Sequence, residues 1–416
     1  MRALCLSHIW YSLLYIRDSY GRKHTFVWSC EISSDRDQLH EAGMHACDPR
    51  GTSIISAMLI RPLLLTALLP ARRMLFSRLL SRPRCSAAES QGAAIFPAWA
   101  IAPPELPEEW VACTVSHLEV EALHDLRTQA PKSDSAMLEE LPPGLTIDLG
   151  MRRPSAVELT PTHVRLHFGD DAGPSACLAW SFLAKIAKKR KQGAWQCPSD
   201  CDDTPERIEG FSELTRRAAS LMPIAGSPPT AILGGFGMHR FKGIDPGEDT
   251  ARKLGALGTA RGGLRGRVLD VCTGLGYTCL GAARTPFVEE VVTIELDPLM
   301  VSVQRANPWS SELFTNEKVT RLLGDATEIL PALPDGYFGF VVHDPPANSM
   351  SGELYSLEFY SQLRRVLKDG GTLYHYVGDP SSKASGRLFN GIRERLREAG
   401  FADTKTVQQA YGIVAK

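Results

Sequence analysis

Four short apolar runs in the second half of the chain each end in an acidic residue. The four acids are Asp270, Glu295, Asp325 and Asp344, and helix-length segments separate most of the runs. Uninterrupted runs of valine, leucine and isoleucine are typical of parallel strands buried on both faces. Because the carboxyl ends of parallel strands meet at one edge of a sheet, we expect the four acids to gather there. For any single acid, the alternative is that it only caps the next helix.

The apolar periodicity continues to the C-terminus. Helices are expected at 247–257, 278–285, 298–306, 326–330, 354–367 and 385–399. Gly370 and Gly371 stop a helix ahead of a strand at 372–377, and residues 401–407 and 411–415 predict a terminal hairpin. Strands that alternate with helices predict a doubly wound α/β layer.

Residues 110–235 show a different pattern, which predicts a smaller α+β accessory domain. Strands are expected at 145–149, 156–159 and 164–168, and helices at 178–191 and 208–222. Lys188 to Lys191 either contact RNA phosphates or only complement the dipole of their helix. Cys197 and Cys201 are expected to be free thiols of a reducing compartment, with a zinc site as the alternative.

The N-terminal region divides into three parts. Residues 1–57 show no sustained period and receive no interpretation. Residues 58–90 are rich in arginine and leucine, with no acid from Met58 to Ala88, which predicts a transit peptide for a mitochondrion or a plastid. A secretory signal is the alternative, and a cytoplasmic location is expected if this leader is not used. Its apolar run is too short to span a bilayer. Residues 91–109, rich in alanine and proline, are expected to be a linker.

Gly274 and Gly276 follow the first apolar run and precede a run of small residues that suits a helix. A strand, a glycine-rich turn and a helix N-terminus together indicate a nucleotide-type site, because glycine lets the backbone approach the ligand. Glu295 is placed to hold a ribose diol, since it ends the second strand about 25 residues after the first. Asp325 and the N–H of Ala326 are placed to bind the adenine ring.

Residues 261–416 resemble the class I S-adenosylmethionine (SAM) dependent methyltransferases. The segment from Asp270 to Gly276 matches their D-x-G-x-G-x-G motif, with Cys272 in place of the first glycine. The resemblance implies a seven-stranded Rossmann-like sheet whose last strand is antiparallel, within a SAM-dependent domain at 236–416. The implied cofactor contacts are Asp270, Thr273, Gly274, Gly276, Tyr277, Glu295, Asp325 and Ala326.

Asp344, Pro345 and Pro346 resemble the D/N-P-P-Y/F/W motif of amino-group methyltransferases, in which the acid and the next carbonyl align the target amine. The stretches DVCTGLGYT, HDPP and GELYSLEFY are also similar to a predicted archaeal methyltransferase family. Ala347 stands where that motif has an aromatic ring, so we expect nucleic-acid bases to be less favoured than other amines. Tyr355 is one aromatic residue that could replace the ring and contact the substrate. No metal is expected.

The glycine-rich junction at 234–243 precedes these motifs. We expect it to form one wall or lid of the cofactor cleft, with His239 and Lys242 as candidates for contacting the substrate or the SAM carboxylate. The alternative is a structural linker with exposed basic residues.

Three functions remain open. The first is SAM-dependent methyl transfer to an amino nitrogen of an acceptor that the sequence does not name; RNA, protein and small amines are the candidates. The second is aminopropyl transfer from decarboxylated SAM, with an acidic polyamine site built from Glu353, Asp344 and Asp379. The third is a non-catalytic SAM-binding protein, which Cys272 favours. The net charge of −1 gives no general attraction to nucleic acid or anionic membranes, and nothing in the sequence specifies an oligomeric state.

Overall fold

A computed structural model describes the chain in two units, 1–85 and 86–416. The described residues are 9–17, 23–31, 45–46, 96–97, 100–101, 113–169, 176–189, 192–201, 203–258, 262–382 and 385–416. In the first unit, an antiparallel sheet forms from β1 (Ile9–Arg17), β2 (Lys23–Glu31) and β3 (His45–Ala46), which the sequence did not predict. The predicted transit peptide at 58–90 lies outside the described residues. Among the helices that are described, none combines the length and hydropathy needed to cross a membrane.

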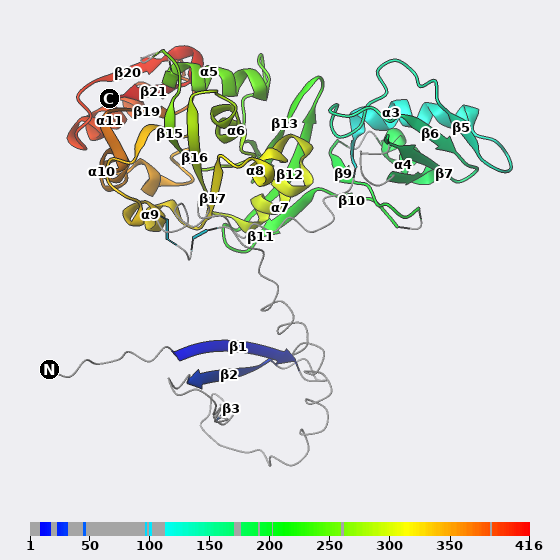
Figure 1. Ribbon diagram of the computed structural model, residues 1–416, viewed down its shortest axis with the longest axis horizontal. Coiled ribbons are helices and arrows are strands. Elements are labelled where there is room, and N and C mark those ends of the chain that lie inside the picture. The colour runs from blue at the N-terminus through cyan, green and yellow to red at the C-terminus, as the bar shows by residue number, and fades with distance from the viewer. Residues whose placement is uncertain are drawn as a thin grey trace. The chain divides into compact units, whose positions relative to one another are not determined.

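A seven-stranded sheet organises the C-terminal part of the second unit (Figure 1). Its spatial order is β17 (Val319–Leu323), β16 (Val288–Glu295), β15 (Gly266–Val271), β18 (Phe338–His343), β19 (Leu367–Tyr376), β21 (Gly412–Ala415) and β20 (Thr404–Val407). The first five are parallel, and β21 is antiparallel to both of its neighbours. The seven strands and the antiparallel last strand confirm the predicted sheet, whose strand order the sequence did not specify. The chain has the class I methyltransferase fold.

Helices cover both faces of this sheet. Neighbouring residues of β15 point to opposite faces: Val268 packs with α5 (Pro246–Gly258), α6 (Tyr277–Ala283) and α8 (Glu312–Thr315). Leu269 packs instead with the side of α9 (Ala326–Ile329), α10 (Leu357–Val366) and α11 (Ser385–Glu398). The predicted helices therefore form, with boundaries shifted by a few residues. The remaining helical elements here are α7 (Pro298–Ala306), η3 (Pro308–Ser310), η4 (Leu330–Ala332), η5 (Gly352–Tyr355) and η6 (Gln408–Ala410).

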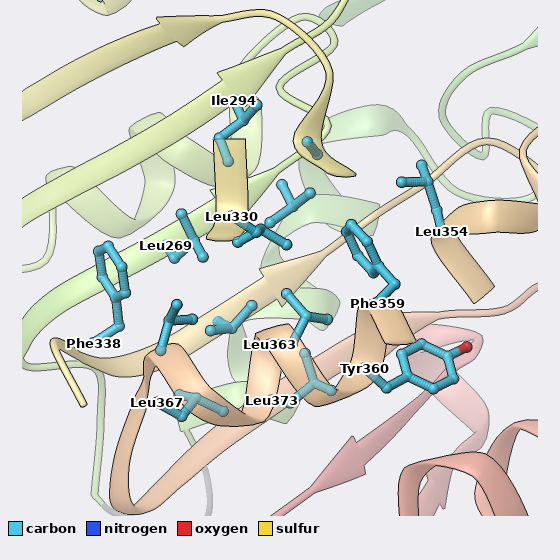
Figure 2. Packing of buried hydrophobic residues seen from close by; sticks show 14 of the residues in the cluster. Leu269, Ile294, Leu330, Phe338, Leu354, Phe359, Tyr360, Leu363, Leu367 and Leu373 are labelled. Atoms are coloured by element: carbon cyan, nitrogen blue, oxygen red, sulfur yellow. The ribbon is translucent and has the colours of Figure 1, made fainter. Parts of the chain in front are cut away.

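The largest apolar cluster lies between the sheet and α10. Figure 2 shows its leucine and aromatic side chains converging from strands and helices that are distant in sequence. The labelled members are Leu269, Ile294, Leu330, Phe338, Leu354, Phe359, Tyr360, Leu363, Leu367 and Leu373. This cluster fixes the parallel strands in register, and so it holds the carboxyl ends of the strands, where the four acids stand, at one edge.

The expected linker is partly built into this domain. The carbonyl of Ala100 accepts a hydrogen bond from the N–H of Leu323 at 2.7 Å, and Ile101 forms an antiparallel bridge with Leu322 on the edge strand β17. Phe96 is 5% exposed and packs edge-on against Tyr337, with ring centroids 5.9 Å apart. The linker expected at 91–109 therefore does not hold for its described residues, which cover the strand edge and add to the core.

Replacing Phe96 by alanine is expected to lower the free energy of unfolding by about 3 kcal/mol, because truncating a buried aromatic side chain typically has this effect. Urea denaturation of the full chain measures the change. The matched control is Phe287→Ala, since Phe287 is 76% exposed. Equal losses in the two variants would show that Phe96 does not contribute to the core.

The accessory region contains two small antiparallel sheets. One consists of β5 (Ala136–Leu138), β6 (Ala156–Leu159), β7 (His163–His167) and β8 (Ala176–Ala179), and the other of β4 (Thr114–Ser116), β9 (Ala194–Gln196) and β10 (Glu206–Arg207). The helical elements are α3 (His117–Asp125), η1 (Leu126–Gln129) and α4 (Trp180–Lys189). The predicted strands at 156–159 and 164–168 are confirmed. The helix expected at 178–191 forms over Trp180–Lys189, because Leu178 and Ala179 belong to β8, and residues 190 and 191 lie outside the described residues. The strand expected at 145–149 is wrong, because Asp148 and Leu149 adopt a left-handed turn conformation with φ of 56°.

A four-stranded meander joins this region to the seven-stranded sheet. It consists of β11 (Glu209–Ser212), β12 (Arg217–Ile224), β13 (Ser227–Leu233) and β14 (Phe236–Gly237). The helix expected at 208–222 is therefore wrong. In β12, buried residues alternate with more exposed ones, which is the period of a strand whose one face packs on α7.

The cysteines of the accessory region also differ from expectation. Cys177 and Cys201 form a disulfide, so the prediction of a free thiol is wrong for Cys201. Cys197 is a free, buried thiol next to Cys113. Spacing along the chain pointed to Cys197 and Cys201, whereas the fold brings Cys201 to β8. No group of three metal-ligating side chains occurs in the described part of the chain.

Candidate active site

The glycine turn after β15 has the backbone that a close ligand needs. Gly274 and Gly276 have φ of 55° and 81°, and Gly276 directly precedes α6. A Cβ at Gly274 would lie 2.6 Å from the sulfur of Met238, and one at Gly276 would overlap Leu313. Cys272 also has a positive φ, of 71°, so the backbone of the first motif is kept although the residue is not glycine. The N–H groups of Cys272, Thr273, Gly274 and Gly276 already donate within the chain, so contact of the turn with an adenosyl ligand remains a prediction.

The carboxylate of Asp270 supports this turn. It is fully buried and accepts hydrogen bonds from the hydroxyls of Thr278 and Thr293, both at 2.7 Å. Burial raises the pKa of Asp270 to about 7, and the two hydroxyl bonds oppose the rise. Thr273 shares a 2.6 Å hydrogen bond with Thr293. Asp270 and Thr273 therefore fix the conformation of the turn, and their direct contact with a cofactor remains a prediction.

Glu295 stands next to the glycine turn. One carboxylate oxygen accepts the N–H of Gly274 and the other that of Asp297, both at 2.9 Å. Burial raises the pKa of Glu295 to about 7, while these N–H groups lower it. Each carboxylate oxygen keeps a second lone pair. The backbone bonds thus orient a half-buried carboxylate that can still accept two ribose hydroxyls.

Asp325 caps α9, so the alternative role of a helix cap, given above for any single acid at a strand end, applies to it. Its Oδ1 accepts the N–H of Thr327 at 2.8 Å and the hydroxyl of Thr327 at 2.7 Å. Ala326 follows as the first, buried residue of the helix. The capping role explains the acid without a ligand, so adenine binding by Asp325 and Ala326 stays a prediction.

The four acids nevertheless share one location, as expected. Their common neighbour is Cys272, on the turn. Burial raises the pKa of the Cys272 thiol, and the four nearby carboxylates raise it further. In order of effect, they are Glu295, Asp344, Asp270 and Asp325. Acids from four separate strand ends can act on one thiol only if those ends converge.

The junction segment forms a wall beside the turn. Met238 lies over Gly274, and the ring of His239 stacks on Tyr277 with centroids 4.9 Å apart. Tyr277 is buried and its hydroxyl donates to the carbonyl of Pro229 at 2.9 Å. Burial lowers the pKa of His239 to about 3, so the imidazole is neutral. Lys242, the other candidate from this segment, is exposed.

Sequence reasoning missed the partners of Asp344. The Nζ of Lys253 donates to Asp344 at 2.6 Å and pairs with Asp249 at 3.0 Å, and Arg240 pairs with the other oxygen of Asp249 at 2.5 Å. Side chains of Lys253 and Asp249 are 2% and 0% exposed, whereas Asp344 is 19% exposed. Pro345, the next residue, is buried. Asp344 is therefore the accessible end of a buried chain of charges.

The charges of this network stabilise one another. Burial alone would lower the pKa of Lys253, but Asp344 and Asp249 outweigh burial and raise it. Burial raises the pKa of Asp344, and Lys253 limits that rise. Asp249 and Lys253 are four residues apart on α5, which is also the spacing of an ordinary ion pair on a helix surface. The sequence therefore indicated that the two residues could pair, but not that the pair is buried.

The loop after Asp344 is braced from the core. The carbonyl of Pro346 accepts hydrogen bonds from the hydroxyls of Tyr355 at 2.9 Å and Ser351 at 3.1 Å. Tyr355 is 2% exposed, so in this structure it supports the loop, and its contact with a substrate remains a prediction. His343 and His375 stack with centroids 4.6 Å apart, and burial lowers the pKa of both, which makes them neutral packing residues.

Comparison with known proteins shows similarity over the C-terminal part of the chain. The Spermine/spermidine synthase domain family matches residues 244–407, which include α5 and the seven-stranded sheet down to β20. The uncharacterized protein MJ1233 of Methanocaldococcus jannaschii is 45% identical over 189 residues, 45% of this chain and 64% of that protein. Polyamine aminopropyltransferase 2 of Streptomyces coelicolor is 35% identical over 147 residues, 34% of this chain. Putrescine N-methyltransferase 4 of Nicotiana tabacum is 27% identical over 113 residues, 26% of this chain.

The similarity covers only part of each relative. The matched region spans 26% of the Streptomyces protein and 28% of the Nicotiana protein. By their names, these two relatives transfer different groups, one an aminopropyl group and the other a methyl group. The comparisons therefore agree with the fold and with a SAM-type nucleoside site, and they leave the transferred group to be argued from the site.

Proposed function

We propose that the chain transfers a methyl group from SAM to an amino nitrogen. The observation that carries the proposal is the partly exposed carboxylate of Asp344, held by Lys253 at the strand edge that also carries Glu295 and the glycine turn. A sulfonium methyl is already activated, so the protein mainly has to position the nucleophile in line with it.

Different residues would bind SAM and position the acceptor amine. Glu295 would hold the ribose of SAM, and the glycine turn that orients Glu295 would line the same site. The Oδ2 of Asp344 is occupied by Lys253, which leaves Oδ1 to accept an N–H of the acceptor amine and so direct its lone pair. After the methyl–nitrogen bond forms and the sulfur–methyl bond breaks, the extra proton leaves the nitrogen, and Asp344 is the nearest base among the residues placed here.

Aminopropyl transfer is the second candidate, and the match of residues 244–407 to the Spermine/spermidine synthase domain favours it. Both reactions would use the same adenosyl site. They differ in the ligand, because decarboxylated SAM lacks the carboxylate of intact SAM. Lys253 and Arg240 are already ion-paired with Asp344 and Asp249, so these charges favour neither ligand.

Calorimetry on the full chain tests the proposal. We expect SAM and S-adenosylhomocysteine to bind about tenfold or more tightly than decarboxylated SAM and methylthioadenosine, which lack the carboxylate, as one charged contact is worth this much. A preference for decarboxylated SAM would support aminopropyl transfer instead. Failure of all four ligands to bind would reject both reactions.

A further inference from the structure

We infer that Arg217 binds the carboxylate at the amino-acid end of SAM, so that a residue outside the seven-stranded sheet selects intact SAM over decarboxylated SAM. The inference deepens the proposed function and rests on it. It follows from the place of the β11–β12 turn at the strand edge and from the guanidinium that this turn carries there.

The β11–β12 turn contacts the strand edge on both sides of the glycine turn. On one side, the hydroxyl of Thr215 donates to Oδ2 of Asp297 at 2.9 Å, two residues after Glu295 at the end of β16. On the other side, Nη2 of Arg217 donates to the carbonyl of Met350 at 3.3 Å, in the loop that follows β18. Because β15 lies between β16 and β18 in the sheet, the β11–β12 turn reaches across the end of β15, where the glycine turn begins.

Packing connects Arg217 to the glycine turn. Ala219 and Leu221 follow Arg217 on the same face of β12, and both belong to one apolar cluster with Leu275 of the glycine turn. The stem of Arg217 lies against Gly234, where an added Cβ would be 3.6 Å from its Cδ. Gly234 begins the junction segment that forms the wall beside the glycine turn. Arg217 therefore continues the row of β12 side chains toward the loop after β18, whose carbonyl it contacts.

The guanidinium of Arg217 keeps most of its donors. It has five N–H bonds, and the carbonyl of Met350 is its one hydrogen-bond partner among the described residues. Although the side chain is half-buried, no carboxylate in the described part of the chain forms an ion pair with it. Lys253 and Arg240, the other cations near the strand edge, are already paired. Arg217 is thus the cation that can take a carboxylate, which its planar fork binds with two parallel N–H bonds.

The carboxylate of SAM is the anion that the proposed reaction brings to this place. Glu295 at the end of β16 would hold the ribose, and the sulfonium has to face the acceptor amine beside Asp344 at the end of β18. The amino-acid end of SAM leaves the same sulfur atom, in the region that the β11–β12 turn spans. Decarboxylated SAM has the same sulfonium and the same amine, but it has no group for Arg217 to bind.

The test compares SAM with decarboxylated SAM by calorimetry on the full chain, because the two ligands differ only in the carboxylate. Arg217→Met should lower the affinity for SAM by about tenfold or more, as expected for the loss of a charge-assisted contact. Its affinity for decarboxylated SAM should change by less than about twofold. Arg216→Met is the matched control and should bind both ligands like the native chain, since Arg216 is 75% exposed and paired with Glu213.

An equal loss of affinity for both ligands would overturn the inference alone, because Arg217 would then only brace the loop through Met350. Unchanged affinity for SAM would overturn it too, and slower labelling of the acceptor by that variant would assign the guanidinium to the acceptor instead. Arg217→Lys is the second variant if the methionine variant does not melt cooperatively. Lysine keeps the charge without the planar fork, so it should weaken binding of SAM only, by a smaller factor. Failure of the native chain to bind either ligand would reject the proposed function and the inference with it.

Discussion

Asp344→Asn is expected to lower the rate of transfer by about 10²–10⁴-fold, the usual contribution of a positioned base. Asparagine keeps the shape of the side chain but removes the negative charge that orients the acceptor N–H and receives the proton. The measurement is incorporation of label from methyl-labelled SAM into the extracted pool, whether RNA, protein or small molecules, that the native chain labels. Binding of SAM itself should change little, because Glu295 and the glycine turn are unaltered.

Asp369→Asn is the matched control for this variant. Asp369 is fully exposed near the start of β19, whereas Asp344 stands at the carboxyl ends of the parallel strands. Replacement of Asp369 should therefore leave the rate unchanged. The Asp344 variant should still fold, because Lys253 keeps its ion pair with Asp249. A folded Asp344→Asn chain that retains the native rate would remove Asp344 from the mechanism.

The sheet and its acidic edge could be predicted from the sequence because strand ends obey local rules. Each apolar run is long enough for a buried strand, and the residue that ends a parallel strand lies at the carboxyl edge of the sheet. Glu295 and Asp344 could therefore be predicted to lie at the same edge from the sequence alone. The likeness to the class I methyltransferases supplied what the pattern could not, namely the number of strands and the antiparallel last strand, β21.

The charge network could not be predicted in the same way. Asp249 and Lys253 have the spacing of a surface ion pair, and only the packing of α5 against β18 and β19 buries them. Arg240 belongs to the glycine-rich junction, whose path has no sequence periodicity. Burial of a charged residue depends on which elements meet in space, and that information is distributed over the whole fold.

Two other differences have the same origin. Phe96 lies in a segment whose composition indicates a linker, yet the segment packs on Tyr337 through Phe96 and pairs with β17 through Ala100 and Ile101. Cys177 pairs with Cys201 across 24 residues because β8 runs beside that loop. Cys272 illustrates the converse, since it departs from the family motif but keeps the backbone conformation of glycine. That retained geometry weakens the case for a non-catalytic protein.

Glu295→Ala is expected to weaken SAM binding by about 100-fold, because two hydrogen bonds from ribose hydroxyls to a carboxylate are together worth about 3 kcal/mol. The alanine variant also leaves the N–H of Gly274 without its acceptor, which loosens the turn. Calorimetry with SAM measures the loss. Glu289→Ala, an exposed position on the same strand, is the control and should bind like the native chain.

The same carboxylate predicts how binding by the native chain depends on pH. The pKa of Glu295 in the folded chain is about 7, raised from its ordinary value by burial, so the side chain is largely protonated below pH 7 and ionised above it. Ribose hydroxyls donate to the ionised form, and SAM affinity should therefore fall by up to about tenfold for each pH unit below 7. The Glu295→Ala chain should lose most of this dependence. A native affinity that stays constant from pH 5.5 to 8, or a steep dependence that survives the alanine substitution, would mean that the ribose is held elsewhere.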